Sequence, residues 1–438
     1  MITRSKHLAI LTTALMLGAG LAACGSDETK SADGKTTITF WDDNGGPART
    51  PVWQHIIAEF QKANPTIAVK YVGIPIAQVQ QKYDTAIAGG GLPDVGGVST
   101  AMLSSLVAQK SLDAVDDRLS GGALSGKLNE QVVATVKGTV PDGKTYMVPM
   151  STNMGVFWYR TDWFKEAELE APTNWSDFFT ATEKLTDTAK NRYGFTIRGG
   201  AGSIAQMLEV MYGQSGITEI FDASGKATVN DPKNVAALEK LAGMYKKVTP
   251  EADISNDYVK MVAQFDGGNI AIMQHNLGSY TDHVETLGKD KVAAMAVPKS
   301  DSGVQAILSN PVAGIGLFTS GKQKDAAYKF AEFAASKAMN SYWAEQTGVL
   351  PANTEVADEA WIQQSQHVSM AVKVLNDPAT KIVQLPYHLP EFNAITKTDS
   401  EPEFQKVLQG SLPAKDFLDV LATKLTEAQA AYKQRNGG

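Results

Sequence analysis

Residues 36–72 read TTITFWDDNGGPARTPVWQHIIAEFQKANPTIAVKYV and contain the clearest fold signal in the chain. Within them, Thr37–Trp41 alternates in polarity and is rich in β-forming residues, which predicts a strand. Residues 51–62 repeat their apolar side chains at helical spacing. Ile67–Val72 then predicts a second strand. A strand, a helix and a strand in succession predict an α/β sheet with helices on its faces.

The alternation of strands and helices continues beyond this stretch. A helix around Tyr83 and a short strand ending at Val98 follow, and a second α/β set begins near Met154. Ligands bind at the carboxyl ends of the strands in such sheets, so we expect the loops Asp42–Asn44 and Val98–Thr100 at that edge. The other predicted strands are Gly155–Tyr159, Gly194–Ile197, Ile270–Met273 and Ala293–Val297, and the other predicted helices span residues 175–185, 204–212, 232–247, 328–336 and most of the tail from Glu401.

The N-terminal segment predicts export. Arg4 and Lys6 precede an apolar run over residues 8–21, which is shorter than the roughly 20 apolar residues of a membrane span. The small residues that follow end at Cys24, the only cysteine of the chain, and this arrangement resembles the bacterial lipoprotein signal. In that family the cysteine is lipidated and becomes the mature N-terminus. The alternative is an ordinary secretory signal with a chance cysteine. Residues 24–35 are polar and predict a flexible tether.

The chain length and the net charge limit the number of domains and the classes of partner that we expect. The 438 residues exceed what one hydrophobic core usually serves, so we expect two domains. Removal of residues 1–23 takes away two cations and changes the formal net charge from −7 to −9. This acidic balance argues against a nucleic-acid partner, which needs clustered cations.

Residues 138–145 (GTVPDGKT) match the phosphate-loop pattern G-x-x-x-x-G-K-[ST]. That pattern binds a nucleotide when a strand precedes the loop and a helix N-terminus follows it. Here residues 141–143 predict a turn, and residues 145–148 predict a strand that Pro149 ends. We therefore do not interpret the match as a nucleotide site.

Residues 200–205 (GAGSIA) fit the dinucleotide-binding pattern G-x-G-x-x-A between a predicted strand and a predicted helix, with Asp222 near the expected acidic position. The segment around Asp222 has the composition of a turn, which argues against a dinucleotide. A glycine-lined wall that lets a neutral ligand approach the backbone is the better interpretation, and it makes Gly200 a candidate ligand-binding residue.

Catalytic and metal-binding motifs are missing from the sequence. It contains no G-x-S-x-G and no H-E-x-x-H, and its histidines lack metal-ligand spacing. Asp42 and Asp43 raise the possibility of paired carboxylates, but adjacent residues at a strand end are expected to point apart, in a solvated turn. We therefore predict no catalytic residue, no metal and no cofactor.

Aromatic and amide residues recur where predicted strands end. Sugars present apolar C–H faces and a rim of hydroxyls, so a sugar site needs aromatic platforms beside short polar groups. Trp158 and Tyr159 lie on one strand, where only one of them faces a given side, so we expect at least one in the core. Trp53 and Trp175 are expected to pack on helices. The recurring set is Trp41, Asn44, Asn153, Trp158, Tyr159, Asn276, Tyr280, Tyr387 and His388.

Several segments in order along the chain resemble the extracellular solute-binding proteins of carbohydrate ABC importers, the maltose-binding-protein-like family. Each is weak alone, and their order is specific. Besides the lipoprotein signal they are Phe40-Trp41, residues 60–65 (FQKANP), 91–95 (GLPDV), 142–149 (DGKTYMVP), 157–162 (FWYRTD), 172–175 (PTNW), 272–280 (IMQHNLGSY) and 347–351 (TGVLP).

The resemblance implies an α/β, two-lobed periplasmic-binding-protein-like fold whose hinge-linked lobes close around a ligand cleft. Lobe 1 is expected to comprise residues 36–150 and to regain about 300–345. Lobe 2 is expected to comprise residues 151–299 with a helical return over about 346–438. The chain is expected to cross between the lobes near residues 147–153 and again near 297–314.

Positions that match the family's cleft walls supply further site predictions. The family often has tryptophan at the position of Tyr280. This difference affects which substrate is expected more than which class of protein is expected. With the aromatic and amide set and the two sheet-edge loops, the predicted ligand-binding residues are Asp42, Asn44, Ser99, Thr100, Asn153, Trp158, Gly200, Asn276, Tyr280, Gly314, Tyr387 and His388.

The function that the resemblance implies is capture of a mono- or oligosaccharide outside the cell membrane and its delivery to the membrane subunits of an ABC permease. The protein is expected to be a monomer, not an enzyme, anchored by lipid to the outer face of the membrane. An exported glycoside-acting enzyme is one alternative, although no facing carboxyl pair is evident. A binding protein for a peptide, a polyamine or iron is the other, and the Tyr387-His388 pair is the only hint of iron.

Overall fold

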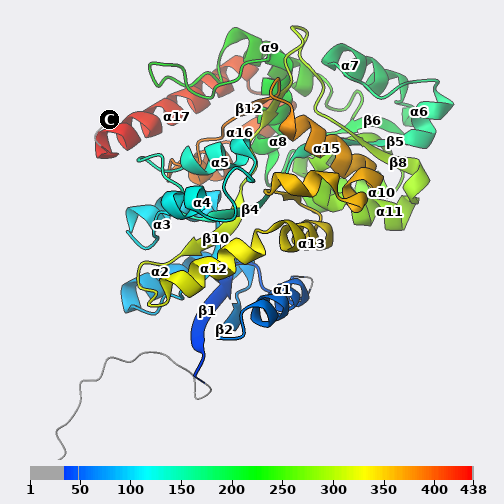
Figure 1. Cartoon of the computed structure of the whole chain (residues 1–438). Helices are drawn as coiled ribbons and strands as arrows, with labels where there is room; N and C mark the ends of the chain where they lie inside the picture. The colour runs from blue at the N-terminus through cyan, green and yellow to red at the C-terminus, as the bar shows by residue number, and fades with distance from the viewer. Residues whose placement is uncertain (1–33, 48, 437–438) are drawn as a thin grey trace, which may run out of the picture.

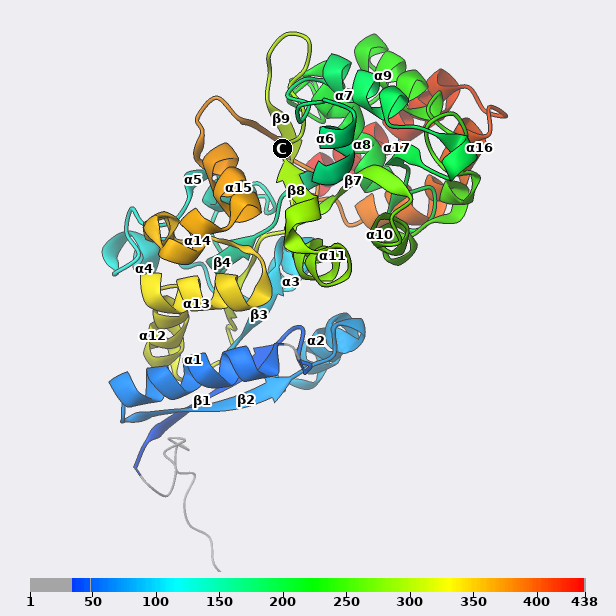
Figure 2. The ribbon, with the colours of Figure 1, turned by 90° about the vertical axis from the view of Figure 1, so that its right-hand side faces the viewer.

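Two separate β-sheets organise the chain in the computed structural model, which describes residues 34–47 and 49–436 (Figures 1 and 2). The larger sheet has the order β11-β4-β10-β3-β1-β2, and we call it and its helices lobe 1. β1 runs parallel to both β2 and β3, whereas β10 is antiparallel to β3 and β4. The strands of this sheet are β1 (Thr36–Asp42), β2 (Ile67–Gly73), β3 (Val95–Ser99), β4 (Val148–Thr152), β10 (Ala313–Leu317) and β11 (Leu350–Pro351).

The smaller sheet has four strands in the order β6-β7-β5-β8, and we call it and its helices lobe 2. β6 is parallel to β7, and β5 is antiparallel to both of its neighbours. A separate parallel pair consists of β9 (Ala306–Leu308), which lies between β8 and β10 in the chain, and β12 (Lys381–Val383), which follows β11. The strands of lobe 2 are β5 (Gly155–Arg160), β6 (Tyr193–Thr196), β7 (Ile270–Asn276) and β8 (Val292–Met295).

Helices cover both sheets (Figure 1). The α-helices are α1 (Thr50–Ala63), α2 (Val79–Gly89), α3 (Thr100–Ala108), α4 (Asp116–Gly121), α5 (Glu130–Lys137), α6 (Thr161–Glu166), α7 (Trp175–Lys184), α8 (Ser203–Ser215), α9 (Pro232–Ala242), α10 (Tyr258–Asp266), α11 (Tyr280–Leu287), α12 (Lys324–Ala334), α13 (Lys337–Thr347), α14 (Ala360–Gln364), α15 (Gln366–Asn376), α16 (Glu401–Leu408) and α17 (Ala414–Asn436). The short 3-10 turns include η1 (Ile76–Gln78) and η4 (Leu277–Ser279), and a π-helical segment spans Ala394–Asp399.

Local sequence explains the helices that the spacing predicted. α1 starts at Thr50 and has Pro51, whose fixed φ suits the first turn, as its next residue, and it buries the apolar face that includes Trp53. The ring of Trp53 meets Phe40 of β1 edge-on, with 4.6 Å between centroids, and so joins helix to sheet. α7 begins at Asn174, whose Oδ1 accepts from the Asp177 amide at 2.9 Å, as the capping pair predicted. Both predicted packing tryptophans, Trp53 and Trp175, are buried.

The chain passes between the lobes through short segments. Only Asn153 and Met154 separate the end of β4 in lobe 1 from the start of β5 in lobe 2, and residues 296–312 carry the chain back from β8 to β10. We call these the first and second crossings. The segments expected were residues 147–153, most of which lie in β4, and 297–314. The chain was expected to pass to lobe 2 near residue 346. β11 lies after that point but pairs with β4, so it still belongs to lobe 1.

Two of the differences between the predicted and the observed element boundaries have a clear physical reason. Pro149 does not end a strand but lies inside β4, where the register against β10 shifts between Ala313 and Gly314. An irregularity of this kind tolerates a residue without an N–H donor. The predicted helix 232–247 ends at Ala242, because Gly243 begins a series of turns that includes Lys246 at φ 62°.

In the described residues, no helix combines the length and the apolar composition that crossing a membrane requires. The predicted signal segment and Cys24 lie outside the described residues, as does most of the predicted tether.

Candidate functional site

The strand ends of the two sheets border the same crossings. In lobe 1, Ser99 at the end of β3 pairs with Ala313, the first residue of β10, which also pairs with Ser151 of β4. In lobe 2, Asn276 at the end of β7 pairs with Gly155, the first residue of β5. β10 and β5 begin where the chain arrives from the other lobe, so both carboxyl edges face the crossings. Such edges are where ligands bind in open α/β sheets.

We call these the lobe 1 edge and the lobe 2 edge. The lobe 1 edge consists of the segments after β1, β2 and β3, and the lobe 2 edge consists of the segments after β6 and β7 together with the N-terminus of α10. Helix α10 belongs there because it leads directly into β7 and runs back along it, so its first residue, Tyr258, lies near the carboxyl end of β7. The ring of Tyr258 accordingly stacks on His275.

Asp42 and Asp43 do not lie apart in a solvated turn, contrary to the sequence prediction. Both side chains are buried and share Arg49, whose Nε lies 3.2 Å from Asp42 Oδ1 and whose Nη2 donates to Asp43 Oδ1 at 3.0 Å. The Tyr71 hydroxyl also donates to Asp42, at 2.9 Å. Gly97 on β3 permits this packing, since a Cβ there would lie 2.5 Å from Asp43 Oδ1. Asp42 therefore stabilises the edge and has no surface left for a ligand.

The other predicted residues of the lobe 1 edge differ in their exposure. Thr100 is fully buried, and its hydroxyl accepts from the Val312 amide at 3.1 Å while its own amide donates to the Val312 carbonyl at 3.0 Å. It fastens the second crossing to β3, and none of its surface is exposed to a ligand. Ser99 is half-buried and Asn44 is exposed, so both stay candidates.

Four predicted residues come together at the lobe 2 edge: Asn153, Trp158, Asn276 and Tyr280. Asn153 Oδ1 accepts from the Leu277 amide at 3.3 Å, which links the first crossing to the turn after β7. Asn276 Oδ1 accepts from the Gly278 amide at 3.0 Å and caps that turn. Both amide side chains are half-buried beside the crossing.

Trp158 has none of its surface exposed, so the prediction that it contacts ligand is wrong for this structure. Its Nε1 donates to the Asn276 carbonyl at 3.1 Å, and its ring stacks under Tyr280 at 5.9 Å. Tyr280 in turn stacks on His367 of α15 at 3.8 Å, which covers one of its faces. Tyr159, the other aromatic residue of this strand pair, packs against Phe164. The prediction that at least one of these two residues lies in the core is confirmed.

The two predicted glycines approach backbone rather than ligand. The Gly200 amide donates to the Asn256 carbonyl at 2.8 Å, and a Cβ on Gly200 would lie 2.7 Å from the Ser255 carbonyl oxygen. A Cβ on Gly314 would lie 2.4 Å from the Val148 carbonyl oxygen, inside the strand pair β10–β4. Close packing between segments of this chain therefore accounts for both glycines.

The dinucleotide-like motif has the predicted strand–helix context, but its anion position is filled. Gly202 precedes α8 at φ 84°, and its amide donates to Glu401 Oε1 at 2.6 Å. A carboxylate of this chain thus occupies the helix N-terminus that a phosphate would need. Asp222 lies in a turn, as predicted, and its Oδ1 accepts from the Ser224 amide at 2.8 Å.

Tyr387 and His388 are engaged within the fold. The Tyr387 hydroxyl donates to the Ser309 carbonyl of the second crossing at 3.4 Å, and burial raises its pKa. His388 Nε2 lies 2.7 Å from Gln429 Oε1 of α17, and burial lowers its pKa. Tyr387 borders the crossing, whereas His388 faces the C-terminal helix, so the two do not form one ligand-binding pair.

The list of predicted ligand-binding residues does not include three residues at the lobe 2 edge: Arg198, Tyr258 and His275. Arg198 follows β6, and its Nε donates to the Ala201 carbonyl at 2.6 Å. His275 is the penultimate residue of β7, and burial, with the charges of Arg198 and His283, lowers its pKa to about 4. Tyr258 directly follows Asp257, whose carboxylate accepts from the Lys260 amide as an N-cap. That capping signal was available in the sequence and would have placed an aromatic residue at the start of a helix.

A fourth missed residue, Glu209, is a buried carboxylate beside both crossings. Gln274 of β7 donates to its Oε2, and the backbone of Leu308 also hydrogen bonds to it. A Cβ on Gly155 would lie 2.1 Å from the same Oε2. Burial raises the pKa of Glu209 to about 7. Glu209 is the only charged residue within α8, which was the available signal.

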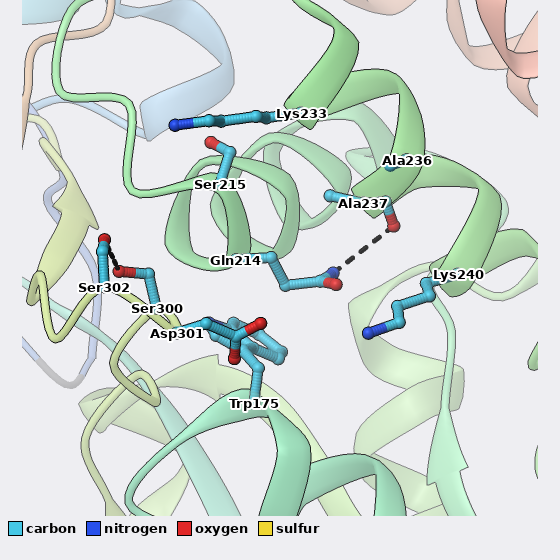
Figure 3. A pocket seen from close by; sticks show the side chains of 10 residues that line it. All are labelled: Trp175, Gln214, Ser215, Lys233, Ala236, Ala237, Lys240, Ser300, Asp301 and Ser302. Atoms are coloured by element: carbon cyan, nitrogen blue, oxygen red, sulfur yellow. Dashed lines mark hydrogen bonds between the residues drawn. The ribbon is translucent and has the colours of Figure 1, made fainter.

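A cavity of about 350 Å³ lies on lobe 2 away from both edges (Figure 3). Gln214 and Ser215 from the end of α8, Lys233 and Lys240 from α9, and Trp175 from α7 line it. α8 begins at the lobe 2 edge and is roughly 20 Å long at 1.5 Å per residue, so this cavity is at the opposite end of the helix. Its lysine ammonium groups are on the exposed flank of α9, and it contains none of the predicted ligand-binding residues.

Comparison with known sequences places the chain among binding proteins. A sequence model of the bacterial extracellular solute-binding protein family matches residues 55–370. A putative ABC transporter periplasmic-binding protein of Escherichia coli is 26% identical over 364 residues, which are 81% of each chain. The mannitol-binding protein of Pseudomonas aeruginosa is 25% identical over 370 residues, 78% of this chain and 82% of the relative.

Comparison with solved structures gives the same fold. The sugar-binding protein MalE of Xanthomonas citri has a TM-score of 0.78 at 19% identity, covering 91% of this chain and 98% of the other. The GacH receptor of Streptomyces glaucescens, solved unliganded and with acarbose, has a TM-score of 0.72 at 23% identity, covering 91% and 99%. The predicted two-lobed α/β fold is confirmed. With the match over most of its length, the chain belongs to the bacterial extracellular solute-binding proteins.

Proposed function

We propose that this protein captures a mono- or oligosaccharide outside the cell membrane and delivers it to the membrane subunits of an ABC permease. One observation carries the proposal: two α/β lobes present their strand carboxyl edges to the same pair of short crossings. A ligand that touches both edges only when the lobes approach shifts the population towards the closed form.

The residues of the edges support a sugar rather than a charged solute. Asn44, Asn153 and Asn276 offer amides, and Tyr258 offers an aromatic ring. The carboxylates of Asp42 and Asp43 are buried and both pair with Arg49, so neither is free for a cationic ligand. A polyamine would need free carboxylates there. The names of two relatives, the mannitol-binding protein and an arabinooligosaccharide-binding protein of Bacillus subtilis, also favour a carbohydrate.

The proposal includes a non-enzymatic, monomeric receptor attached by lipid on Cys24 to the outer face of the membrane. The basis for attachment is the position of the only cysteine at the end of the signal segment. Mass spectrometry of the membrane fraction tests it: a diacylglyceryl group on Cys24 supports the anchor. A secreted protein that starts elsewhere and carries no lipid contradicts it.

A thermal-shift screen of the mature chain with Cys24→Ser tests ligand capture. The panel is maltose, maltotriose, arabinotriose and mannitol, with amino acids, dipeptides, spermidine and ferric citrate as controls. A ligand at 100 times its dissociation constant adds about 2.7 kcal/mol of stability. A selective carbohydrate response with the sugar recovered intact supports the receptor. Consumption of the sugar indicates the glycoside-acting enzyme, and a response to a control solute alone overturns the substrate class.

A further inference from the structure

We infer that the cavity of lobe 2 in Figure 3 is a second binding site, which takes a small hydroxylated organic anion with a phosphate or a carboxylate group. Its volume of about 350 Å³ lies within the range of small-molecule sites, roughly 300–1,000 Å³. None of its lining residues belongs to either edge, so its ligand does not need the lobes to close. This site is therefore independent of the proposed sugar capture.

The wall of the cavity contains a buried donor without a partner. Trp175, the first residue of α7, is 2% exposed, yet its Nε1 forms no hydrogen bond with any residue that the structure describes. A Cβ on Gly213 would lie 3.4 Å from this nitrogen, which places Nε1 beside the end of α8, where Gln214 also lines the cavity. A buried donor without an acceptor destabilises the fold, so this position favours an occupant that supplies an acceptor.

Two cations border the cavity above this donor. Lys233 and Lys240 lie about two turns apart on the same face of α9. Figure 3 shows Lys233 extending across Ser215 and Lys240 extending towards Gln214. No ion pair between the described residues uses either ammonium group, and that of Lys240 lies 5.0 Å from the ring centroid of Phe179. Each ammonium group therefore has donors available for an anion.

The uncharged polar groups of the wall are engaged with the fold. Ser300 Oγ accepts from the Val304 amide at 3.0 Å. Gln214 Nε2 donates to the Ala237 carbonyl at 3.4 Å, the bond that is dashed in Figure 3. Asp301 is the one carboxylate that lines the cavity, and two lysines with one carboxylate leave a net charge of 2 − 1 = +1. That balance favours an anion, and the Asp301 carboxylate can accept from hydroxyl groups of the same ligand.

Isothermal titration of the mature chain with Cys24→Ser tests the inference, at low ionic strength, where exposed charges are least screened. The probes are glucose 6-phosphate, gluconate and inorganic phosphate. Lys233→Met and Lys240→Met keep most of the side-chain length without the charge, and each is expected to weaken binding of the organic anion about fivefold. Asp301→Asn keeps an acceptor but removes the opposing charge, so it is expected to strengthen binding a few-fold. Lys329→Met, at an exposed position of α12 in lobe 1, is the matched control and is expected to bind normally.

The outcomes separate this site from the sugar receptor. If the unchanged protein binds neither organic probe, or binds inorganic phosphate alone, the inferred site is overturned. Equal affinities for Lys240→Met and Lys329→Met also overturn it, because the anion would then bind elsewhere. A response to one organic probe alone supports the site and identifies phosphate or carboxylate as the group that it recognises.

The probes do not belong to the sugar panel. A protein that binds these anions but no panel sugar therefore keeps this site while the proposed function falls, and the reverse result leaves the receptor standing. The substituted side chains are exposed, so all variants are expected to fold, and thermal unfolding of each variant verifies this.

Discussion

Charged residues follow strands at both edges, but they differ in how far the rest of the fold engages them. At the lobe 1 edge, the carboxylates of Asp42 and Asp43 both pair with Arg49 inside the fold. At the lobe 2 edge, no hydrogen bond between the described residues uses the terminal amino groups of Arg198, and Tyr258 keeps half of its surface exposed. The comparison teaches that topology identifies where a ligand binds, whereas the internal partners of each side chain determine which residues remain available to it.

Asp42→Ala is expected to have the largest effect on stability. It removes a fully buried carboxylate that pairs with Arg49 and accepts from the Tyr71 hydroxyl and the Asn44 amide, and each buried group left without its partner costs about 1–3 kcal/mol. Urea unfolding measures the change. Asp84→Ala, at an exposed position of α2, is the control and is expected to cost less than about 0.5 kcal/mol. A small loss for Asp42→Ala together with a large loss of sugar affinity would reverse the roles assigned to the two edges.

Glu209 is a buried carboxylate that forms no ion pair with any residue that the structure describes. Its pKa is raised by burial from 4.5 to about 7, so the folded protein binds its proton more tightly than the unfolded chain does. The stabilisation is therefore complete below about pH 4.5 and is lost as the pH rises through about 7, a change of about 3 kcal/mol. Urea unfolding between pH 4.5 and 8 should show this slope, and Glu209→Gln should remove the contribution of Glu209.

The control for Glu209 is Glu219→Gln, at an exposed position, which should leave the slope unchanged. Equal slopes for the unchanged protein and Glu209→Gln would show that the carboxylate is solvated in solution. The contrast between a paired Asp42 and an unpaired Glu209 would then disappear.

Asn153→Ala examines the joint between the lobes. Asn153 Oδ1 accepts from the Met154 amide at 2.9 Å and from the Leu277 amide at 3.3 Å, so the variant leaves two backbone donors without this acceptor. The expected loss is about 1–2 kcal/mol of unfolding free energy. Asn393→Ala, at an exposed position without a side-chain cap, provides the control. A loss no larger than that of the control would mean that water replaces the Asn153 acceptor.

Much of the fold could be predicted from sequence, because hydrophobic periodicity and caps are local. β1, α1 and β2 follow the pattern of residues 36–72 closely, and Asn174 caps α7 as expected. Pro149 was misread because a shift in the register of β4 against β10 depends on a partner strand more than 150 residues away.

The candidate site was predictable only in part, for the same physical reason. Asn153, Asn276 and Tyr280 do come together at one edge, since strand ends converge there. The sequence does not show that Trp158 lies beneath Tyr280 or that Arg49 forms an ion pair with Asp42. Burial and long-range pairing decide both. Tyr258 was missed because the helix that presents it was not recognised.

Ile76→Ser is expected to have the smallest effect and gives the lobe 1 counterpart of Tyr258. Ile76 in η1, which follows β2, is 69% exposed, so its loss should change the unfolding free energy by less than about 0.5 kcal/mol.

Of the four large apolar side chains most exposed in the described part of the chain, three lie at the facing edges: Ile76, Tyr258 and Val259. Val420→Ser, on α17 away from both edges, is the matched control. If lobe closure brings the two edges together, Ile76→Ser should weaken sugar binding by a few-fold while Val420→Ser does not. Equal affinities for the two variants would mean that the apolar side chain of the lobe 1 edge stays in water in the closed form, and that only the lobe 2 edge contributes apolar contact.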